Sequence, residues 1–152
     1  MNRALYCIIC LGLSCSLLAE DKPPSSFTFN HVALSVQDID SSAAFYSQVL
    51  GLKEIVNQSE VAGIRWFSLG EGKELHLISV LREPVSVKKA VHFAITIPDF
   101  DSFLQILDKA GIEYSSWPGN PGDLTVRADQ TRQIYTQDVD DYWIEVNSVA
   151  SD

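Results

Sequence analysis

The sequence of 152 residues predicts an α+β fold made of two similar halves. The main evidence is a repeat of two motifs in the same order. The motif HVALSVQDIDS at residues 31–41 returns as HFAITIPDFDS at residues 92–102, an offset of 61 positions. The motif ELHLISV at residues 74–80 returns as WIEVNSV at residues 143–149, an offset of 69 positions. Two matches in the same order indicate an internal structural repeat.

The first half shows the pattern of a strand, a helix and a hairpin. The opening segment alternates and is β-branched, which is typical of a half-buried strand. Residues 38–41 (DIDS) supply helix-capping side chains, and Gly51 stands where a helix commonly ends. A turn at residues 71–73 separates two alternating segments, as in a hairpin. The expected elements are a strand over 31–36, a helix from Ile39 to Leu50, and hairpin strands over 64–70 and 74–80.

The second half repeats these signals. Residues 99–102 (DFDS) repeat the capping signal, and Gly111 marks the expected helix end. Extra loop residues around 117–122 account for the larger offset of the second motif. The expected elements are a strand over 91–97, a helix from Phe100 to Ala110, and hairpin strands over 132–138 and 140–149.

Residues 1–19 predict a cleaved secretory signal peptide. A positive residue precedes a run of apolar residues, and Ala19 suits cleavage. Residues 20–26 are polar and proline-rich, so we expect a flexible tether to one domain over residues 27–152. The mature chain is then expected in the periplasm or outside the cell, without a stable membrane span. The open alternatives are an uncleaved N-terminal anchor and a lipoprotein signal at Cys15.

Composition narrows the classes of partner and ligand. The chain has 11 basic and 20 acidic residues and a formal net charge of −9. Nucleic-acid binding needs clusters of Lys and Arg, so nucleic acid is not an expected partner. All three cysteines, Cys7, Cys10 and Cys15, fall within the predicted signal peptide. A metal site in the mature chain would therefore use histidine and carboxylate ligands.

Four potential metal ligands occupy equivalent places in the two halves. His31 and His92 begin the first strands, and His76 and Glu145 match each other in the last strands. A pseudo-symmetric fold would bring these strands together around one axis, so we predict one divalent metal ion (Zn, Ni, Mn, Co or Fe) held by all four. A strand histidine taken alone is more often packed or on the surface. Glu74 is an alternative to His76, because it points to the same face.

Residues 27–149 resemble the vicinal oxygen chelate superfamily, which includes glyoxalase I, methylmalonyl-CoA epimerase, fosfomycin-resistance proteins, extradiol dioxygenases and bleomycin-binding proteins. The resemblance is carried by HVALSVQDIDSSAAFYSQVLGL, ELHLIS, VHFAITIPDFDS and DVDDYWIEV. It implies two βαβββ modules forming a cup-shaped mixed sheet around the metal. Two positions depart from the family. Residues 138–141 read DVDD instead of the common Asp-Pro-Asp-Gly, and His76 stands where glyoxalase I and the epimerases typically carry Glu or Gln.

The resemblance implies a small-molecule substrate whose two adjacent oxygens chelate the metal. It favours a lactoylglutathione-lyase-like lyase or isomerase, with Glu145 as a ligand and as the catalytic proton carrier. Arg65 and Tyr135 are the predicted substrate-binding residues. A homodimer is expected, in which the ligands can come from two chains. The alternatives are an iron-dependent dioxygenase and a non-catalytic, bleomycin-resistance-like module that binds a small molecule or a metal. Such a module would be favoured if Trp66, Trp117 and Trp143 lined the cup, whereas we expect most of these side chains to pack in the core or at an interface.

Overall fold

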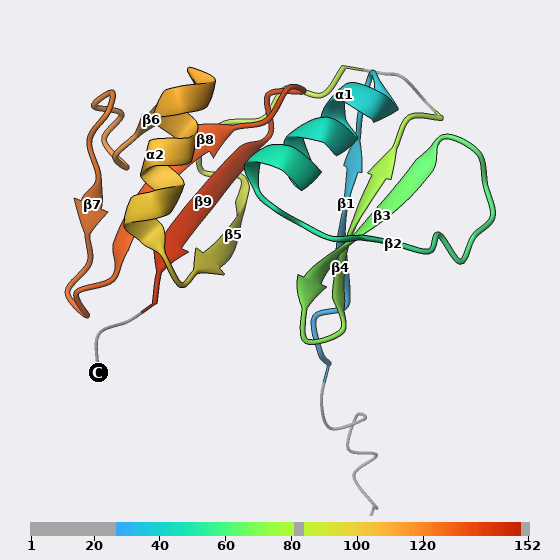
Figure 1. Cartoon of the computed structure of the whole chain (residues 1–152), viewed down its shortest axis with the longest axis horizontal. Coiled ribbons are helices and arrows are strands. Elements are labelled where there is room, and N and C mark those ends of the chain that lie inside the picture. Colours follow the sequence, from blue (N-terminus) through green and yellow to red (C-terminus); the bar gives the residue numbers. More distant parts are fainter. Residues whose placement is uncertain (1–26, 81–83, 150–152) are drawn as a thin grey trace, which may run out of the picture.

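A computed structural model of the chain describes residues 27–80 and 84–149 (Figure 1). The predicted signal peptide and tether lie outside the described residues. Among the residues that are described, no helix is long and apolar enough to cross a membrane. The first module contains β1 (His31–Ser35), α1 (Ile39–Ala44), a π-helical turn (Phe45–Val49), β2 (Glu54–Ile55), β3 (Ile64–Gly70) and β4 (Lys73–Ile78). The second module contains β5 (His92–Ile97), α2 (Phe100–Ala110), β6 (Tyr114–Ser115), β7 (Thr125–Val126), β8 (Arg132–Gln137) and β9 (Trp143–Ser148).

The two modules share one topology, which confirms the predicted pair of βαβββ units. The strand order is β1-β4-β3-β2 in the first sheet and β5-β9-β8-β6 in the second, where β7 also pairs with β8. In each sheet the first and last strands of the module are parallel neighbours, and the other pairs are antiparallel. The modules lie side by side, each with its own mixed sheet (Figure 1). Sequence patterns did not predict the two-residue strands β2, β6 and β7.

Both helices start where the capping residues predict. The side chain of Asp38 accepts a hydrogen bond from the backbone N–H of Ser41 at 2.7 Å, and Asp99 does the same for Ser102 at 3.0 Å. The helix α2 ends at Gly111, whose φ of 65° places it in the left-handed region that glycine adopts without strain. The first helix differs from the prediction in its last turn, which is π-helical.

The core lies between the helices and one face of each sheet. On β4, the buried Leu75 and Leu77 alternate with His76, which is only partly buried. The helix α1 packs on β3 and β4, and α2 contacts the π-helical turn, so the two modules share one apolar core. The opposite face of each sheet carries the predicted ligands, since successive side chains of a strand point to opposite faces.

Among the described residues, five hydrogen bonds join residues 138–142, the β8–β9 turn of the second module, to the first module. We call the two buried side-chain pairs among them the inter-module latch. The hydroxyl of Tyr46 donates to Asp138 at 2.6 Å, and the hydroxyl of Ser42 donates to Asp140 at 2.6 Å. Both carboxylates are buried. They are the two positions of the DVDD segment that match the family's Asp-Pro-Asp-Gly, so the contact between the modules uses the residues that follow the family pattern.

Candidate metal centre

Strand register places the predicted ligands in equivalent surroundings in the two sheets. His76 lies between Ala33 of β1 and Trp66 of β3, and Glu145 lies between Ala94 of β5 and Tyr135 of β8. The two small alanines leave space beside the ligand positions, and both are exposed. We call the side of each sheet that carries these residues the site face. The sequence repeat therefore corresponds to a structural repeat at the positions that matter for a metal site.

In the second module, His92, Glu145 and Tyr135 form one cluster on the site face. The Nε2 atom of His92 lies 3.2 Å from Oε2 of Glu145. The Tyr135 hydroxyl donates a 2.5 Å hydrogen bond to the same oxygen, and the Tyr135 ring contacts the His92 ring edge-on at 5.4 Å. The side chain of Glu145 is 11% exposed, and that of His92 is 22% exposed. Of the two predicted substrate-binding residues, Tyr135 is thus placed beside the ligands.

The carboxylate of Glu145 is held in its ionised form. Burial by itself would raise the pKa of Glu145, but hydrogen bonds from Tyr135 and Asn147 outweigh burial and lower this pKa below its usual value. Asn147 Nδ2 donates to Oε1 at 2.8 Å, so each carboxylate oxygen has its own donor. The pKa of Tyr135 is raised by burial and by the neighbouring Glu145, which keeps the hydroxyl protonated as a donor. An ionised carboxylate is the form that binds a metal.

The donor set of this cluster fits a divalent metal ion. His92 Nδ1 lies 2.7 Å from the carbonyl oxygen of Lys89, and a carbonyl can only accept a hydrogen bond. His92 Nδ1 therefore carries its hydrogen, and Nε2 is directed at Glu145. An Nε2–H of a protonated His92 would form an ion pair with Glu145 at this distance, and a metal ion could take the place of that proton. The 3.2 Å spacing of the imidazole nitrogen and the carboxylate oxygen matches two ligands that are each about 2.0–2.2 Å from one metal.

In the first module, His31 and His76 are stacked. Their ring centroids are 4.3 Å apart with planes inclined by 12°, and Trp66 stacks on His76 at 4.0 Å and 4°. His76 Nε2 lies 2.8 Å from Oε2 of Glu74, the alternative ligand of the sequence analysis. The nitrogens of nearly parallel rings point along parallel directions, so the two imidazoles do not converge on one point. Metal binding by both would require a side-chain rotation.

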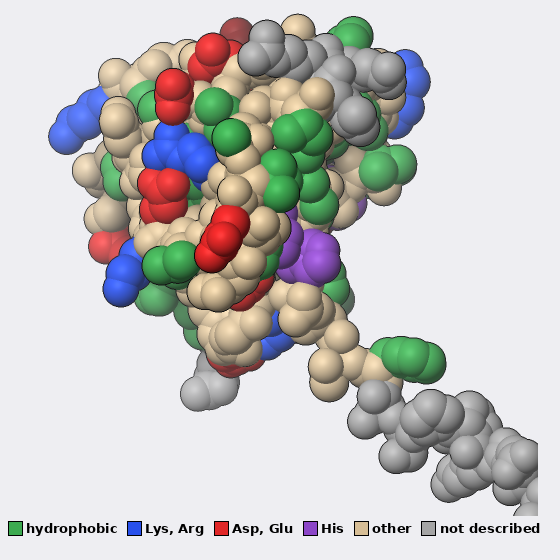
Figure 2. Space-filling model, turned by 90° about the vertical axis from the view of Figure 1, so that its right-hand side faces the viewer, with side chains coloured by type: hydrophobic (Ala, Val, Ile, Leu, Met, Phe, Trp, Pro, Cys, Tyr) green, Lys and Arg blue, Asp and Glu red, His purple; other side chains and the backbone are tan. Residues whose placement is uncertain are grey.

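The four predicted ligands form two pairs, one in each module. Among the described residues, no group of three or more His, Cys, Asp or Glu side chains is placed to hold a metal ion. Histidine (purple) reaches the surface on the face of the molecule shown in Figure 2, beside apolar side chains (green). A site with all four ligands therefore needs the two site faces to be brought together.

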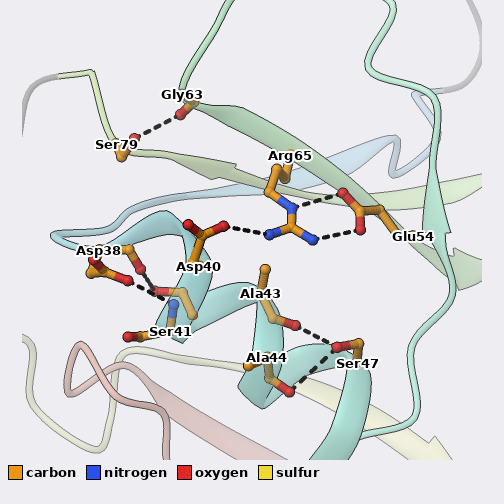
Figure 3. Close-up of polar contacts among 11 residues, drawn as sticks. Asp38, Asp40, Ser41, Ala43, Ala44, Ser47, Glu54, Gly63, Arg65 and Ser79 are labelled. Carbon is orange, nitrogen blue, oxygen red and sulfur yellow. Dashed lines mark hydrogen bonds and ion pairs between the residues drawn. The ribbon is translucent and has the colours of Figure 1, made fainter.

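Arg65 lies away from the histidines. It precedes Trp66 on β3 and points to the opposite face of the sheet. Its guanidinium donates two hydrogen bonds to Glu54, at 2.6 and 2.7 Å, and one to Asp40 at 3.0 Å (Figure 3). All of its described polar contacts join β3 to β2 and to α1. The structure does not bring Arg65, proposed from the sequence as a substrate contact, to the site face.

Several polar residues of the site face were not singled out from the sequence. Gln133 Nε2 donates to the Tyr135 hydroxyl at 3.0 Å, and Asn147 donates to Glu145. Each stands two residues from its partner on β8 or β9, so strand alternation could have placed both on this face. Two buried polar atoms have no hydrogen-bond partner among the described residues, Trp66 Nε1 and Asn147 Oδ1. Each is next to a predicted ligand, so each site face has an unused hydrogen-bonding group.

Aromatic side chains line the site faces. Trp66 covers His76, and Trp117 lies 6.2 Å from the His92 ring and 5.3 Å from the Tyr135 ring. Trp143 stands two residues before Glu145 on β9 and faces the same side. The described core cluster contains none of the three tryptophans. They are placed to contact a ligand or a second protein surface.

Solved structures share this architecture. The oxidase ChaP-H2 is 21% identical, the match covers 82% of this chain and 94% of that one, and the TM-score is 0.68. A glyoxalase/dioxygenase from Nostoc punctiforme is 24% identical, with 80% and 90% covered and a TM-score of 0.63. A lactoylglutathione lyase from Agrobacterium tumefaciens is 20% identical, with 85% and 97% covered and a TM-score of 0.60. At these identities the likeness establishes the fold.

Comparison at the level of sequence identifies the family. No curated protein matches the chain significantly. The profile of the family described as Glyoxalase/Bleomycin resistance protein/Dioxygenase superfamily matches residues 28–146, which include both modules and all four predicted ligands. The resemblance read from the sequence motifs is therefore confirmed, and the chain belongs to the Glyoxalase/Bleomycin resistance protein/Dioxygenase superfamily.

Proposed function

We propose that the chain is a metal-dependent lyase or isomerase that acts on a small molecule with two adjacent oxygen atoms. The observation that carries this proposal is the pairing of His92 Nε2 with the ionised carboxylate of Glu145 at 3.2 Å. The carbonyl of Lys89 orients His92, and Tyr135 orients Glu145, as outer partners do around metal ligands in proteins. Family membership supports the same reading, since the family includes metal-dependent enzymes.

Each residue of the cluster has a proposed role. A bound divalent metal would act as a Lewis acid on the substrate oxygens. His92 and Glu145 would hold the metal together with His31 and His76. Glu145 Oε2 is the proposed proton acceptor, because Glu145 is the only carboxylate among the four predicted ligands. Its lowered pKa keeps Glu145 ionised and makes it a weaker base, so Tyr135, which donates to the same oxygen, would help return the proton.

We propose that two copies of the chain complete the metal site. Both β1 and β5 are edge strands of their sheets, so each leaves one edge free for pairing among the described residues. The site faces beside these edges expose Ala33 and Ala94, and the neighbouring Val91 is 63% exposed. In a symmetric dimer, the first module of one chain would face the second module of its partner, and two identical sites would result.

Mixing two inactive variants tests the shared site. The His31→Ala chain has an impaired first module, and the His92→Ala chain has an impaired second module. If sites form between chains, mixed dimers contain one site with no altered ligand, and random mixing restores about a quarter of the wild-type sites. If each site forms within one chain, co-refolding the two variants restores none. Mass measured by light scattering gives the dimer content of each mixture.

Metal analysis and turnover test the proposed chemistry. We expect the purified protein to bind one equivalent of Zn, Ni, Mn or Co per site, as measured by elemental analysis and calorimetry. Turnover is first measured with methylglyoxal and glutathione, then with related dicarbonyl compounds. The Glu145→Gln variant should lose activity. Full activity in that variant, or in metal-stripped protein, would exclude this mechanism.

Two alternatives have specific support. His76 is enclosed between two rings and bonded to Glu74, which leaves His31, His92 and Glu145 as a two-histidine, one-carboxylate set. Non-haem iron oxygenases use such sets, so bound iron with oxygen consumption would favour an oxidase or dioxygenase. The tryptophans on the site faces instead favour a non-catalytic binding module. Tight binding of a small molecule without turnover would favour that alternative.

We also propose that the protein is exported, from the sequence of residues 1–19. This predicts a mature N-terminus close to Glu20 and recovery from the periplasmic or extracellular fraction. N-terminal sequencing of the protein from its native cells tests cleavage directly. An intact Met1 or a lipid-modified Cys15 would instead support the anchor or lipoprotein alternatives.

A further inference from the structure

Lys89 has an unusual environment beside the second module's cluster. Its Nζ donates hydrogen bonds to Ser115 Oγ at 2.8 Å and to the carbonyl of Ser116 at 3.0 Å. It also lies over two aromatic rings, 4.8 Å from the centroid of Trp143 and 5.3 Å from that of Tyr135. Both rings belong to the site face. The ammonium group is therefore held in place beside the proposed reaction centre.

The charge of Lys89 has no acidic partner among the described residues. Arg65, Lys73, Arg127 and Arg132 each form an ion pair with a carboxylate, although Lys89 does not. An ammonium group has three N–H donors, and the described residues accept hydrogen bonds from two of them. One donor and one positive charge remain for a ligand.

A cleft adjoins this ammonium group. Its volume is about 340 Å³, at the small end of the range of ligand pockets. The lining includes Ser115, Tyr135 and Trp143, the three side chains that contact Lys89. Tyr114 adds a further ring to the lining. Glu113, which is exposed, also lines the cleft. The aromatic walls and the cation at the border of the cleft suit a flat molecule that carries one negative charge.

We infer that Lys89 binds the carboxylate of a small aromatic or similarly planar acid, whose ring lies in the cleft against Tyr135 and Trp143. This inference rests on the proposed function, because such a ligand would share the site face with the metal pair. It gives the substrate a chemical class: an organic acid in which a planar apolar group lies close to the two oxygens that reach the metal. A neutral dicarbonyl compound would lack the contact with Lys89.

A titration without metal tests this inference separately from the metal site. The EDTA-treated chain is titrated with benzoate and with benzamide, which have the same shape and differ in charge. NMR shifts of the Trp143 indole N–H report binding, and a Trp143→Phe variant assigns that signal. We expect benzoate to bind about tenfold more tightly than benzamide, as a charge-assisted hydrogen bond allows.

Substitutions at two adjacent lysines provide the controls. Lys89→Met should remove the preference for benzoate, and Lys89→Arg should keep it. Lys88→Met is the matched control and should leave it unchanged, because Lys88 is exposed and its described hydrogen bond is made by its backbone. Equal affinities in the wild type, or a benzoate preference that survives Lys89→Met in a folded variant, would overturn the inference. Failure to bind metal would overturn the proposed function and leave this result standing.

Discussion

The two modules share one strand topology, but different side chains surround the predicted ligand positions. In the second module, Tyr135 sits beside Glu145 and donates a hydrogen bond to it. In the first module, Trp66 occupies the equivalent register position and stacks flat on His76. A hydroxyl orients a carboxylate and keeps it ionised, whereas a flat ring only packs against an imidazole. Equivalent positions therefore do not imply equivalent metal affinity.

The register pairs two positions away from these residues along the strands also differ between the modules. Gln133 and Asn147 are register partners in the second module, and Ile64 and Ile78 are the corresponding partners in the first. The polar pair supports Tyr135 and Glu145 through hydrogen bonds, while the isoleucines offer none. If the chain binds a metal as proposed, the second module would hold it with little rearrangement. The first module would have to rearrange, which would reduce the free energy of metal binding available from its histidines.

Removal of one histidine from each module should show the largest difference. We expect His92→Ala to weaken zinc binding by about a hundredfold or more, since a four-ligand zinc site of ~10–16 kcal/mol contributes a few kcal/mol per ligand. We expect His76→Ala to weaken binding by less than about tenfold, because His76 must first leave its stack and Glu74. Calorimetric titration with zinc measures both. Equal losses of zinc affinity in the two variants would show that the histidines of both modules contribute equally to zinc binding.

Loss of the Tyr135 hydroxyl should have the next largest effect. Tyr135→Phe removes a hydrogen bond that stabilises ionised Glu145, so the pKa of Glu145 should rise. Metal affinity should fall by roughly 10–100-fold, as for other outer-shell substitutions. Because protons compete with the metal for the carboxylate, the loss of binding on acidification should begin at a higher pH than in the wild type.

The matched control for this variant is Tyr114→Phe, on the neighbouring strand β6. Tyr114 lines the cleft, and its register partner is Thr136, whose side chain bonds the backbone of Glu113. Metal affinity and its pH dependence should stay at wild-type values in this control. A Tyr135→Phe variant that behaved the same way would mean that the hydroxyl does not support the site.

The inter-module latch should affect stability and leave the metal pair in place. Tyr46→Phe leaves a buried oxygen of Asp138 without its donor, which should lower the free energy of unfolding by about 1–3 kcal/mol. Denaturant unfolding followed by circular dichroism measures the loss. Ser47→Ala is the control, because its hydroxyl bonds only carbonyls of its own helix. A loss no greater than that of Ser47→Ala would show that the latch is not a stabilising contact.

The latch also predicts a specific pH dependence. Burial raises the pKa of Asp138, although the hydrogen bond from Tyr46 lowers it in part. The folded chain therefore holds this proton more tightly than the unfolded chain. Between the ordinary Asp pKa of about 3.9 and the raised folded value, the contribution of Asp138 to stability should fall as pH rises. Tyr46→Phe should raise the pKa further, and NMR titration of the Asp138 carboxyl carbon would detect this rise.

The hydrophobic periodicity and the repeated motifs predicted the fold well, because both depend on where the backbone forms helices and strands. Asp38 and Asp99 cap the helices as expected, and the repeated motifs occupy equivalent strands. The same patterns placed His31, His76, His92 and Glu145 on the site faces. They could not predict that these residues would form two separate pairs, since that depends on how the modules pack through their helices.

Side-chain direction within β3 separates Arg65 from the site face. Arg65 was predicted from the sequence as a contact for an anionic substrate, but alternation directs Trp66 to the site face instead. Lys89 lies in the segment before β5, where no periodicity applies, so only the structure reveals its contacts with Trp143 and Tyr135. Loop residues of this kind are found from packing, not from sequence patterns.

Arg65→Met should have the smallest effect of these changes. The side chain of Arg65 is 32% exposed, and its partners Glu54 and Asp40 are 43% and 88% exposed. Ion pairs in such positions contribute about 1 kcal/mol or less, because water already solvates their charges. Zinc affinity and turnover should not change, since the guanidinium lies on the face of β3 opposite Trp66. A loss of turnover with unchanged stability would instead support a role for Arg65 in substrate binding. It would also show that a change on one face of the first sheet affects the site on the other face.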